Sequence, residues 1–142
     1  MSISKYTEYL NQEPRITRLV HHNIEDVKGR TWPQRVYMSR EIVPECPIFV
    51  SIGWIYDMPS PNPHMFQHVH NSDEVVLHVG IDHKNPTDLG AEIEFQVEDE
   101  KLMIEKTSAL YLPGGIKHCP LTWKKVSRPH LQIAITAGGT YD

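Results

Sequence analysis

Gln67-His-Val-His-Asn-Ser-Asp-Glu74 is the stretch that decides the expected fold and site. Residues two apart on a β-strand face the same side, so His68 and His70 can converge on one point. The turn-favouring residues that follow can return the carboxylate toward the same point. A second stretch, Leu112-Pro-Gly-Gly-Ile-Lys-His118, can deliver another imidazole after a Pro-Gly-Gly turn. The spacing therefore predicts one metal site built from His68, His70, Glu74 and His118.

This ligand set suits several divalent transition metals. Three imidazoles and one carboxylate can bind Fe, Mn, Ni, Co or Zn, and they leave coordination positions open for a substrate. No cysteine belongs to the set, which argues against a closed structural zinc site. Two alternatives stay open at this point. The four residues can be ordinary polar side chains on exposed hairpins, or they can bind metal only loosely.

The two stretches resemble the two motifs of the cupin superfamily. The pattern His-x-His-x3-Glu, followed by Pro-x-Gly-x2-His, matches at the four ligand positions and at Pro113 and Gly115. The resemblance covers roughly residues 46–142 and implies a jelly-roll barrel, or double-stranded β-helix, with a metal inside it. Four scaffold positions depart from the family pattern and none removes a ligand: Asn62, Gly80, Thr107 and Thr122.

Signals for β-strands dominate from about residue 48 onward. The segment 48–56 is β-branched and aromatic, and the segment 91–97 alternates polar and apolar residues. Closely spaced short strands favour a sandwich or barrel over βαβ units. We therefore predict an all-β fold with strands at 48–56, 66–70, 74–81, 91–97, 101–104, 108–112, 117–122 and 130–137.

The first 45 residues carry no motif. Residues 34–39 alternate like a strand, residues 15–20 fit a strand, and residues 4–11 fit a helical turn. We divide the chain into an N-terminal arm, 1–45, and a barrel, 46–142. By analogy with barrels of this kind, the arm packs on the barrel or on a partner subunit. We therefore expect a homodimer, since two-fold dimers are the commonest closed oligomer.

Composition limits the partners. The net charge is −4 at pH 7, and no cluster of Lys and Arg forms the basic stripe that nucleic-acid binding requires. The first residues lack the apolar core of a signal peptide, and no run approaches the roughly 18 apolar residues of a membrane span. Two cysteines, Cys46 and Cys119, are too few for a disulfide framework. We expect a cytoplasmic protein that binds neither nucleic acid nor membranes.

Three further polar residues share predicted inner faces. His78 has the strand parity of Glu74, so it can act as an acid or base near the ion, or it can be a satisfied interior histidine. His130 and Gln132 share one face of the last predicted strand. That face meets either solvent or a wet pocket, and we predict a substrate pocket.

Aromatic and basic residues near the barrel mouth are weaker candidates. Tyr56, with Arg35 and Tyr37, can recognise an anionic or hydroxylated substrate. Cys119 follows His118 directly, so strand alternation turns it away from the ion and predicts a buried structural thiol.

Two functions from different classes fit these residues. The first is a metal-dependent enzyme acting on a small oxygenated metabolite, as an oxygenase, isomerase, lyase or decarboxylase. The alternative is a non-catalytic module that binds or senses a small molecule through the metal. The enzyme needs a proton-transfer group within reach of the substrate, and the binding module does not.

Overall fold

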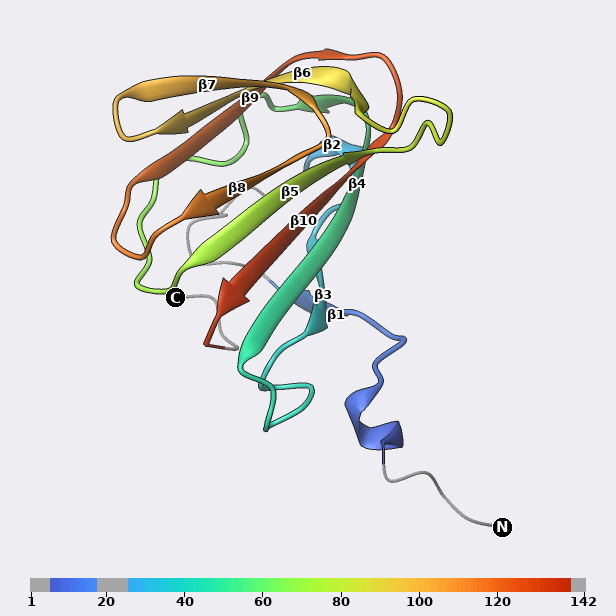
Figure 1. Cartoon of the computed structure of the whole chain (residues 1–142), viewed down its shortest axis with the longest axis vertical. Helices are drawn as coiled ribbons and strands as arrows, with labels where there is room; N and C mark the ends of the chain where they lie inside the picture. Colours follow the sequence, from blue (N-terminus) through green and yellow to red (C-terminus); the bar gives the residue numbers. More distant parts are fainter. Residues whose placement is uncertain (1–5, 18–25, 139–142) are drawn as a thin grey trace.

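Two antiparallel sheets make up the fold (Figure 1). The structure is a computed structural model that describes residues 6–17 and 26–138. The larger sheet has the order β1 (Arg15–Thr17), β3 (Gln34–Met38), β4 (Ile48–Ser60), β10 (His130–Ala137), β5 (Glu74–Gly80) and β8 (Ser108–Leu112), with β2 (Lys28–Arg30) paired to β4. The smaller sheet has the order β7 (Glu100–Lys106), β6 (Asp88–Val97) and β9 (His118–Val126). A short 3-10 helix, Thr7–Tyr9, precedes the strands.

The hydrophobic core lies between the two sheets. Alternate residues of β6, among them Ile93 and Phe95, point inward, as the two-residue period of a strand requires. They pack with Trp123 of β9 and with Ile55 and Val76 of the larger sheet. Full burial of a side chain of this size contributes about 1.5–3 kcal/mol. This core holds the two sheets together and leaves the site on their inner faces.

The all-β prediction is confirmed, and most predicted strands coincide with observed ones. The strand expected at 66–70 is wrong, because only His68 forms a backbone bridge there, to His118. Asn62, four residues before the expected strand, anchors the start of this loop. Its side chain donates to the Trp123 carbonyl oxygen at 2.7 Å and accepts from the Trp123 amide at 3.0 Å. Side-chain bonds therefore hold this loop where a strand ladder was expected.

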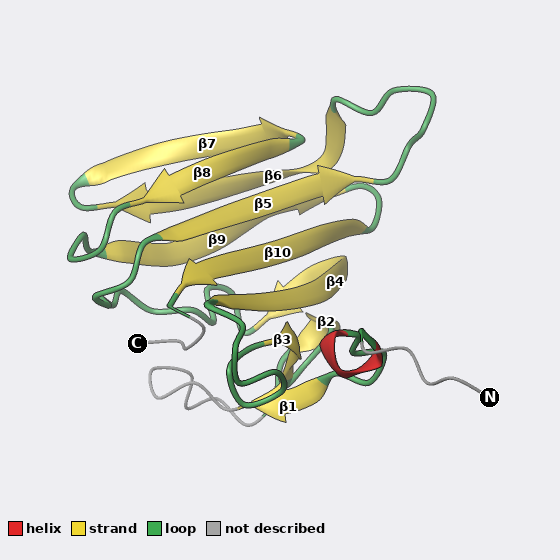
Figure 2. Cartoon of the chain, turned by 60° about the horizontal axis from the view of Figure 1, so that its bottom comes forward, coloured by secondary structure: helices red, strands yellow, loops and turns green. Residues whose placement is uncertain are grey.

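The N-terminal arm extends the larger sheet. Two of its segments, β2 and β3, pair with β4 of the barrel, and β1 pairs with β3 (Figure 2). The arm therefore packs on the barrel of its own chain, and its pairing with a partner subunit stays a prediction. The residues expected as a strand at 18–20 lie outside the described residues. Within the described ranges, no helix is long and apolar enough to cross a membrane.

Candidate metal centre

A backbone bridge joins the two stretches quoted from the sequence. The His68 amide donates to the His118 carbonyl oxygen at 3.0 Å, and the His118 amide donates back to His68 at 3.1 Å. The Gly115 amide donates to the His70 carbonyl oxygen at 2.9 Å. Gly115 has a φ of 87°, a left-handed conformation that glycine adopts without steric cost. The loop after β8 therefore lies directly against the first motif.

Three imidazoles converge beside this bridge. The ligand atoms of His68, His70 and His118 all lie within 4.8 Å of one another. The His118 ring centroid is 4.4 Å from that of His68 and 4.9 Å from that of His70. His70 and His118 are buried and His68 is partly exposed. The structure thus brings the three predicted histidines together.

The same proton arrangement holds in all three rings. Each Nδ1 donates to a main-chain carbonyl oxygen two residues away. The bonds run from His68 to Phe66 at 2.7 Å, from His70 to Ser72 at 3.0 Å and from His118 to Ile116 at 3.2 Å. A carbonyl oxygen only accepts, so these bonds place the proton on Nδ1 and leave a lone pair on Nε2. Metal-binding histidines are oriented in this way, so the donor set fits a divalent metal ion.

Glu74 lies beside two of these lone pairs. Its Oε1 atom is 3.3 Å from His70 Nε2 and 3.4 Å from His118 Nε2, and the side chain is almost fully buried. Thr136 donates to the other carboxylate oxygen at 3.4 Å. Burial raises the pKa of Glu74, but hydrogen bonds from His118 and His70, formed when a proton lies on Nε2, outweigh it and lower the pKa, so the carboxylate is charged. In the tautomer with the proton on Nδ1, a metal ion would take the place of that proton. That Glu74 is the fourth metal ligand stays a prediction.

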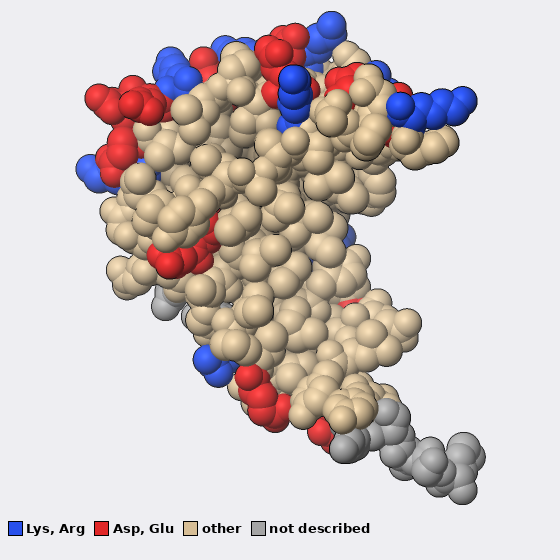
Figure 3. Space-filling model, in the orientation of Figure 1, with Lys and Arg blue, Asp and Glu red and all other residues tan. Residues whose placement is uncertain are grey.

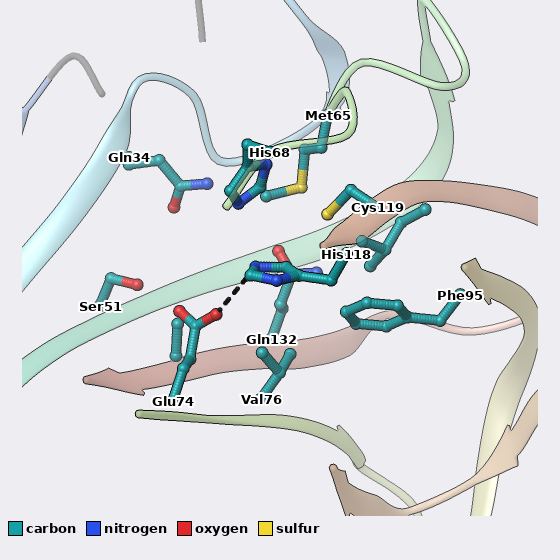
Figure 4. A pocket seen from close by; sticks show the side chains of 12 residues that line it. Gln34, Ser51, Met65, His68, Glu74, Val76, Phe95, His118, Cys119 and Gln132 are labelled. Atoms are coloured by element: carbon teal, nitrogen blue, oxygen red, sulfur yellow. Dashed lines mark ion pairs between the residues drawn. The ribbon is translucent and has the colours of Figure 1, made fainter. Parts of the chain in front are cut away.

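A cavity of about 40 Å³ opens beside these residues (Figure 4). A cavity of this size holds a few water molecules. Its wall combines His68, Glu74 and His118 with residues from both sheets, the arm and the loop before His68. The further lining residues are Gln34, Ser51, Met65, Val76, Phe95, Cys119, Leu121, Gln132 and Ala134.

Comparisons with known proteins identify the fold. No protein-family model matches the sequence, and the search of curated proteins returns no match. Among solved structures, a predicted oxalate decarboxylase from Thermotoga maritima is 12% identical and has a TM-score of 0.52, with 89% of this chain and 92% of that chain covered. These solved structures are cupin-fold proteins. This chain has a cupin fold.

Two other structures agree. A candidate mannose-6-phosphate isomerase from Ralstonia eutropha is 14% identical, with a TM-score of 0.51 and coverage of 82% of this chain and 88% of that chain. The Fe(II) form of HppE is 12% identical, with a TM-score of 0.54 and coverage of 87% and 56%. The expected jelly-roll architecture is confirmed. In this cupin fold, the two sheets do not join into one closed cylinder of hydrogen bonds.

Cys119 departs from the expected alternation of the cupin barrel. Its φ is 74°, so it and His118 are both buried, and Cys119 lines the cavity that it was expected to face away from. Positive φ breaks the two-residue alternation of a strand. Burial raises the pKa of the Cys119 thiol, so it stays protonated. The thiol therefore contributes an uncharged wall atom.

His78, Gln132 and His130 are all buried on the inner face of the larger sheet. Gln132 lines the cavity, and its amide nitrogen lies 3.0 Å from His78 Nε2 on the neighbouring strand. His130 Nε2 accepts a bond from the Trp123 indole N–H at 3.2 Å. Neither histidine lines the cavity. His78 is therefore connected to the cavity only by its contact with Gln132. The His130 ring lies next to that of His78, with centroids 6.2 Å apart.

The structure does not bring Tyr56 to the cavity. Its side chain is 56% exposed, and the inward residue at this point of β4 is its neighbour Ile55. Arg35 and Tyr37 also lie on the outer side of their strand, because Gln34 and Val36 are its buried residues. Alternation puts these residues on the faces opposite the site.

Two buried residues inside the barrel, Arg30 and His64, were not among the predicted site residues. Arg30 ends β2, and its guanidinium Nη1 donates to His64 Nε2 at 3.0 Å. The His64 ring stacks on Trp123, with centroids 5.4 Å apart. The offset of His64 from His68 was a usable signal for an inward histidine. Arg30 had no such signal, because a three-residue strand is too short to show alternation.

Proposed function

We propose that this chain is a metal-dependent enzyme that acts on a small oxygenated metabolite. One observation carries the proposal: three Nε2 lone pairs and a charged carboxylate converge at the wall of a buried cavity. Buried donors without a proton between them repel one another, and a divalent cation removes that repulsion. Nitrogen and oxygen donors in this ratio suit Fe, Mn, Ni, Co or Zn.

A bound metal would supply Lewis acidity to a substrate oxygen. The chain supplies the surroundings. Glu74 keeps its negative charge beside the histidines, and Gln132 directs an amide group at the cavity wall, where it can orient a polar substrate group. Oxygenase, isomerase, lyase and decarboxylase reactions all fit such a site, and the small-molecule substrate is defined only as one that carries oxygen donors.

Metal content tests the proposal directly. The protein, purified without chelator or metal-affinity steps, should contain about one divalent metal ion per chain by elemental analysis. The His68→Ala/His118→Ala variant should lose it, because two of the converging lone pairs disappear. His83→Ala, which changes an exposed histidine, is the matched control and should retain the metal. Absence of metal from the wild type after reconstitution would disprove the proposed site.

A second candidate is a metal-dependent module that binds or senses a small molecule without catalysis. The observation that favours it is the position of His78, which faces the cavity only through Gln132. If the chain is an enzyme that moves a proton through this pair, His78→Ala should retain its metal and ligand affinity but lose turnover. Unchanged turnover in that variant, measured with any substrate that the wild type converts, would remove His78 from the reaction.

We also propose that the chain is a homodimer that uses the outer face of the larger sheet. Apolar residues of three neighbouring strands are in register there, with Ile52, Ile133 and Leu77 forming one row. Trp54 and Leu131 continue the same face. Figure 3 shows that charged side chains gather at the β6–β7 end and that few lie over β10 and β4. A large apolar surface of this kind favours burial against a second copy.

Light scattering tests the dimer. Ile133→Glu puts a charge at the centre of the apolar face and should convert the dimer to a monomer, because an unpaired charge would be buried in the interface. Met103→Glu is the matched control, since Met103 is 52% exposed on the smaller sheet. A monomeric wild type at micromolar concentration would contradict the proposal.

A further inference from the structure

Arg30 is a buried cation without a carboxylate partner. Its side chain is 3% exposed, and no salt bridge joins it to an acidic residue within the part of the chain that the structure describes. Nη1 bonds to His64 and lies 3.9 Å from Met65 Sδ, and Nε donates to the Thr31 carbonyl oxygen at 3.2 Å. Nη2 is buried and has no hydrogen-bond partner among the described residues. The guanidinium therefore keeps unused N–H donors inside the barrel.

The surroundings of Arg30 do not neutralise it. Its charge is among the causes that lower the pKa values of His64, His78 and His130, after burial itself, so these rings are uncharged near neutral pH. The pKa of Arg30 is lowered to about 10 by burial, which still leaves it charged at pH 7. The guanidinium also lies 5.5 Å from the centre of the Trp32 ring, a contact that favours a cation. Burying an unpaired charge costs several kcal/mol, so this arrangement calls for an anion.

The free end of Arg30 lies over β4, beside the part of β10 that carries Gln132. Nη2 lies over Gly53, where a Cβ atom would come within 3.3 Å of it. Gly53 pairs with Gln132, which lines the cavity. Met65, in contact with Nη1, lines the cavity from the other side. Met65 therefore contacts the guanidinium and also lines the cavity, so displacement of its side chain would join the two spaces, and a methionine side chain adapts readily to a ligand.

We propose that Arg30 binds the carboxylate of the molecule whose oxygen atoms approach the metal centre. Gln132 and Glu74 lie four residues apart in register along β10 and β5, a spacing of about 13 Å along the strands. The carboxylate on Arg30 is therefore separated by several carbon atoms from the oxygen atoms near Glu74. A carboxylate oxygen can accept a charge-assisted hydrogen bond from the free N–H groups of Nη2. The assignment of the other end of the ligand rests on the proposed function.

The test measures thermal stabilisation of the metal-loaded protein by a set of linear hydroxy acids and dicarboxylates of increasing chain length. Each acid is paired with its neutral amide at matched ionic strength, and inorganic phosphate is a separate arm. The wild type should be stabilised by longer acids and not by their amides. Arg30→Met should bind the same acids at least about ten-fold more weakly, the loss expected for one buried hydrogen bond to a charged group. Arg35→Met, on the outer face of β3, should respond like the wild type.

Further measurements separate the possible failures. Arg30→Met should retain the metal and be at least as stable as the wild type without ligand, because it removes an unpaired buried charge. If this variant does not fold, Arg30→Lys keeps the charge and should show weakened binding of the acids, because a single ammonium group cannot keep the bonds of Nε and Nη1 and also replace the free N–H groups of Nη2. An equal response to acids in Arg30→Met, a response to phosphate alone, or no response of the metal-loaded wild type would overturn the inference. If the wild-type protein does not bind metal, the result contradicts the proposed function and not the role of Arg30. Binding of the acids is then measured on the metal-free protein.

Discussion

Saturating the metal-free protein with its metal should raise the midpoint temperature of unfolding by about 10 °C. A ligand at a thousand times its dissociation constant, bound only by the native state, adds about 4 kcal/mol to the free energy of unfolding. For a domain of this size each kcal/mol shifts the midpoint by roughly 3 °C. The physical source is the relief of repulsion among the Nε2 lone pairs of His68, His70 and His118, which lie within 4.8 Å of one another.

Differential scanning fluorimetry, with chelator and then with each candidate metal, measures this shift. His70→Ala removes one buried ligand and should lose most of the shift, whereas His83→Ala, at an exposed position, should keep it. The Glu74→Gln variant separates the roles of charge and shape. If the Glu74 carboxylate is a metal ligand, Glu74→Gln should lose much of the stabilisation by metal. An unchanged shift of the midpoint temperature would show that the three histidines suffice for binding.

Acidification should destabilise the protein steeply between pH 6.5 and pH 4. Burial lowers the pKa of His64 and His78 to about 3 and that of His68 and His130 to about 4. The unfolded chain binds protons at these residues below pH 6.5, and the native chain does not. The stability that the neutral rings contribute is therefore complete above pH 6.5 and is lost as the pH falls toward 3–4. At pH 5 the loss is on the order of 2 kcal/mol for each histidine.

Urea unfolding of the metal-free protein at a series of pH values measures this dependence. His130→Gln should flatten this dependence by about a quarter, because one of four similar titrations is removed while the glutamine side chain still offers an acceptor to the Trp123 indole. His83→Gln should leave the slope unchanged. If His130→Gln keeps the full slope, the acid sensitivity has another origin.

The sequence predicted the parts of the site that depend on local spacing. His68, His70 and His118 could be grouped because strand alternation and a Pro-Gly-Gly turn relate them within short segments. Gln132 could be found for the same reason. The strand expected at 66–70 was wrong because only His68 of that segment pairs, with the distant His118, and no local pattern records how far a pairing extends.

The remaining site residues depend on tertiary pairing. Cys119 faces the cavity because of one positive φ value, which the periodicity of a strand does not reveal. Tyr56 and Arg35 were expected at the barrel mouth, but the choice of face for β3 and β4 follows from which residues meet the opposite sheet. Arg30 enters the barrel through the pairing of β2 with β4, a contact between two segments that have no shared sequence signal.

Because of that pairing, the residues in and around the cavity come from two different segments of the chain. The convergent histidines come from the barrel, whereas Gln34 and Arg30 come from the first 45 residues, which add strands to one sheet. Substitutions in the arm can therefore reshape what the cavity accepts while the histidine cluster stays intact. We therefore expect that exchanging arms between barrels of this type changes the part of the cavity wall that holds Gln34 and keeps the histidine cluster, and that a chain trimmed to residue 46 has a cavity open on that side.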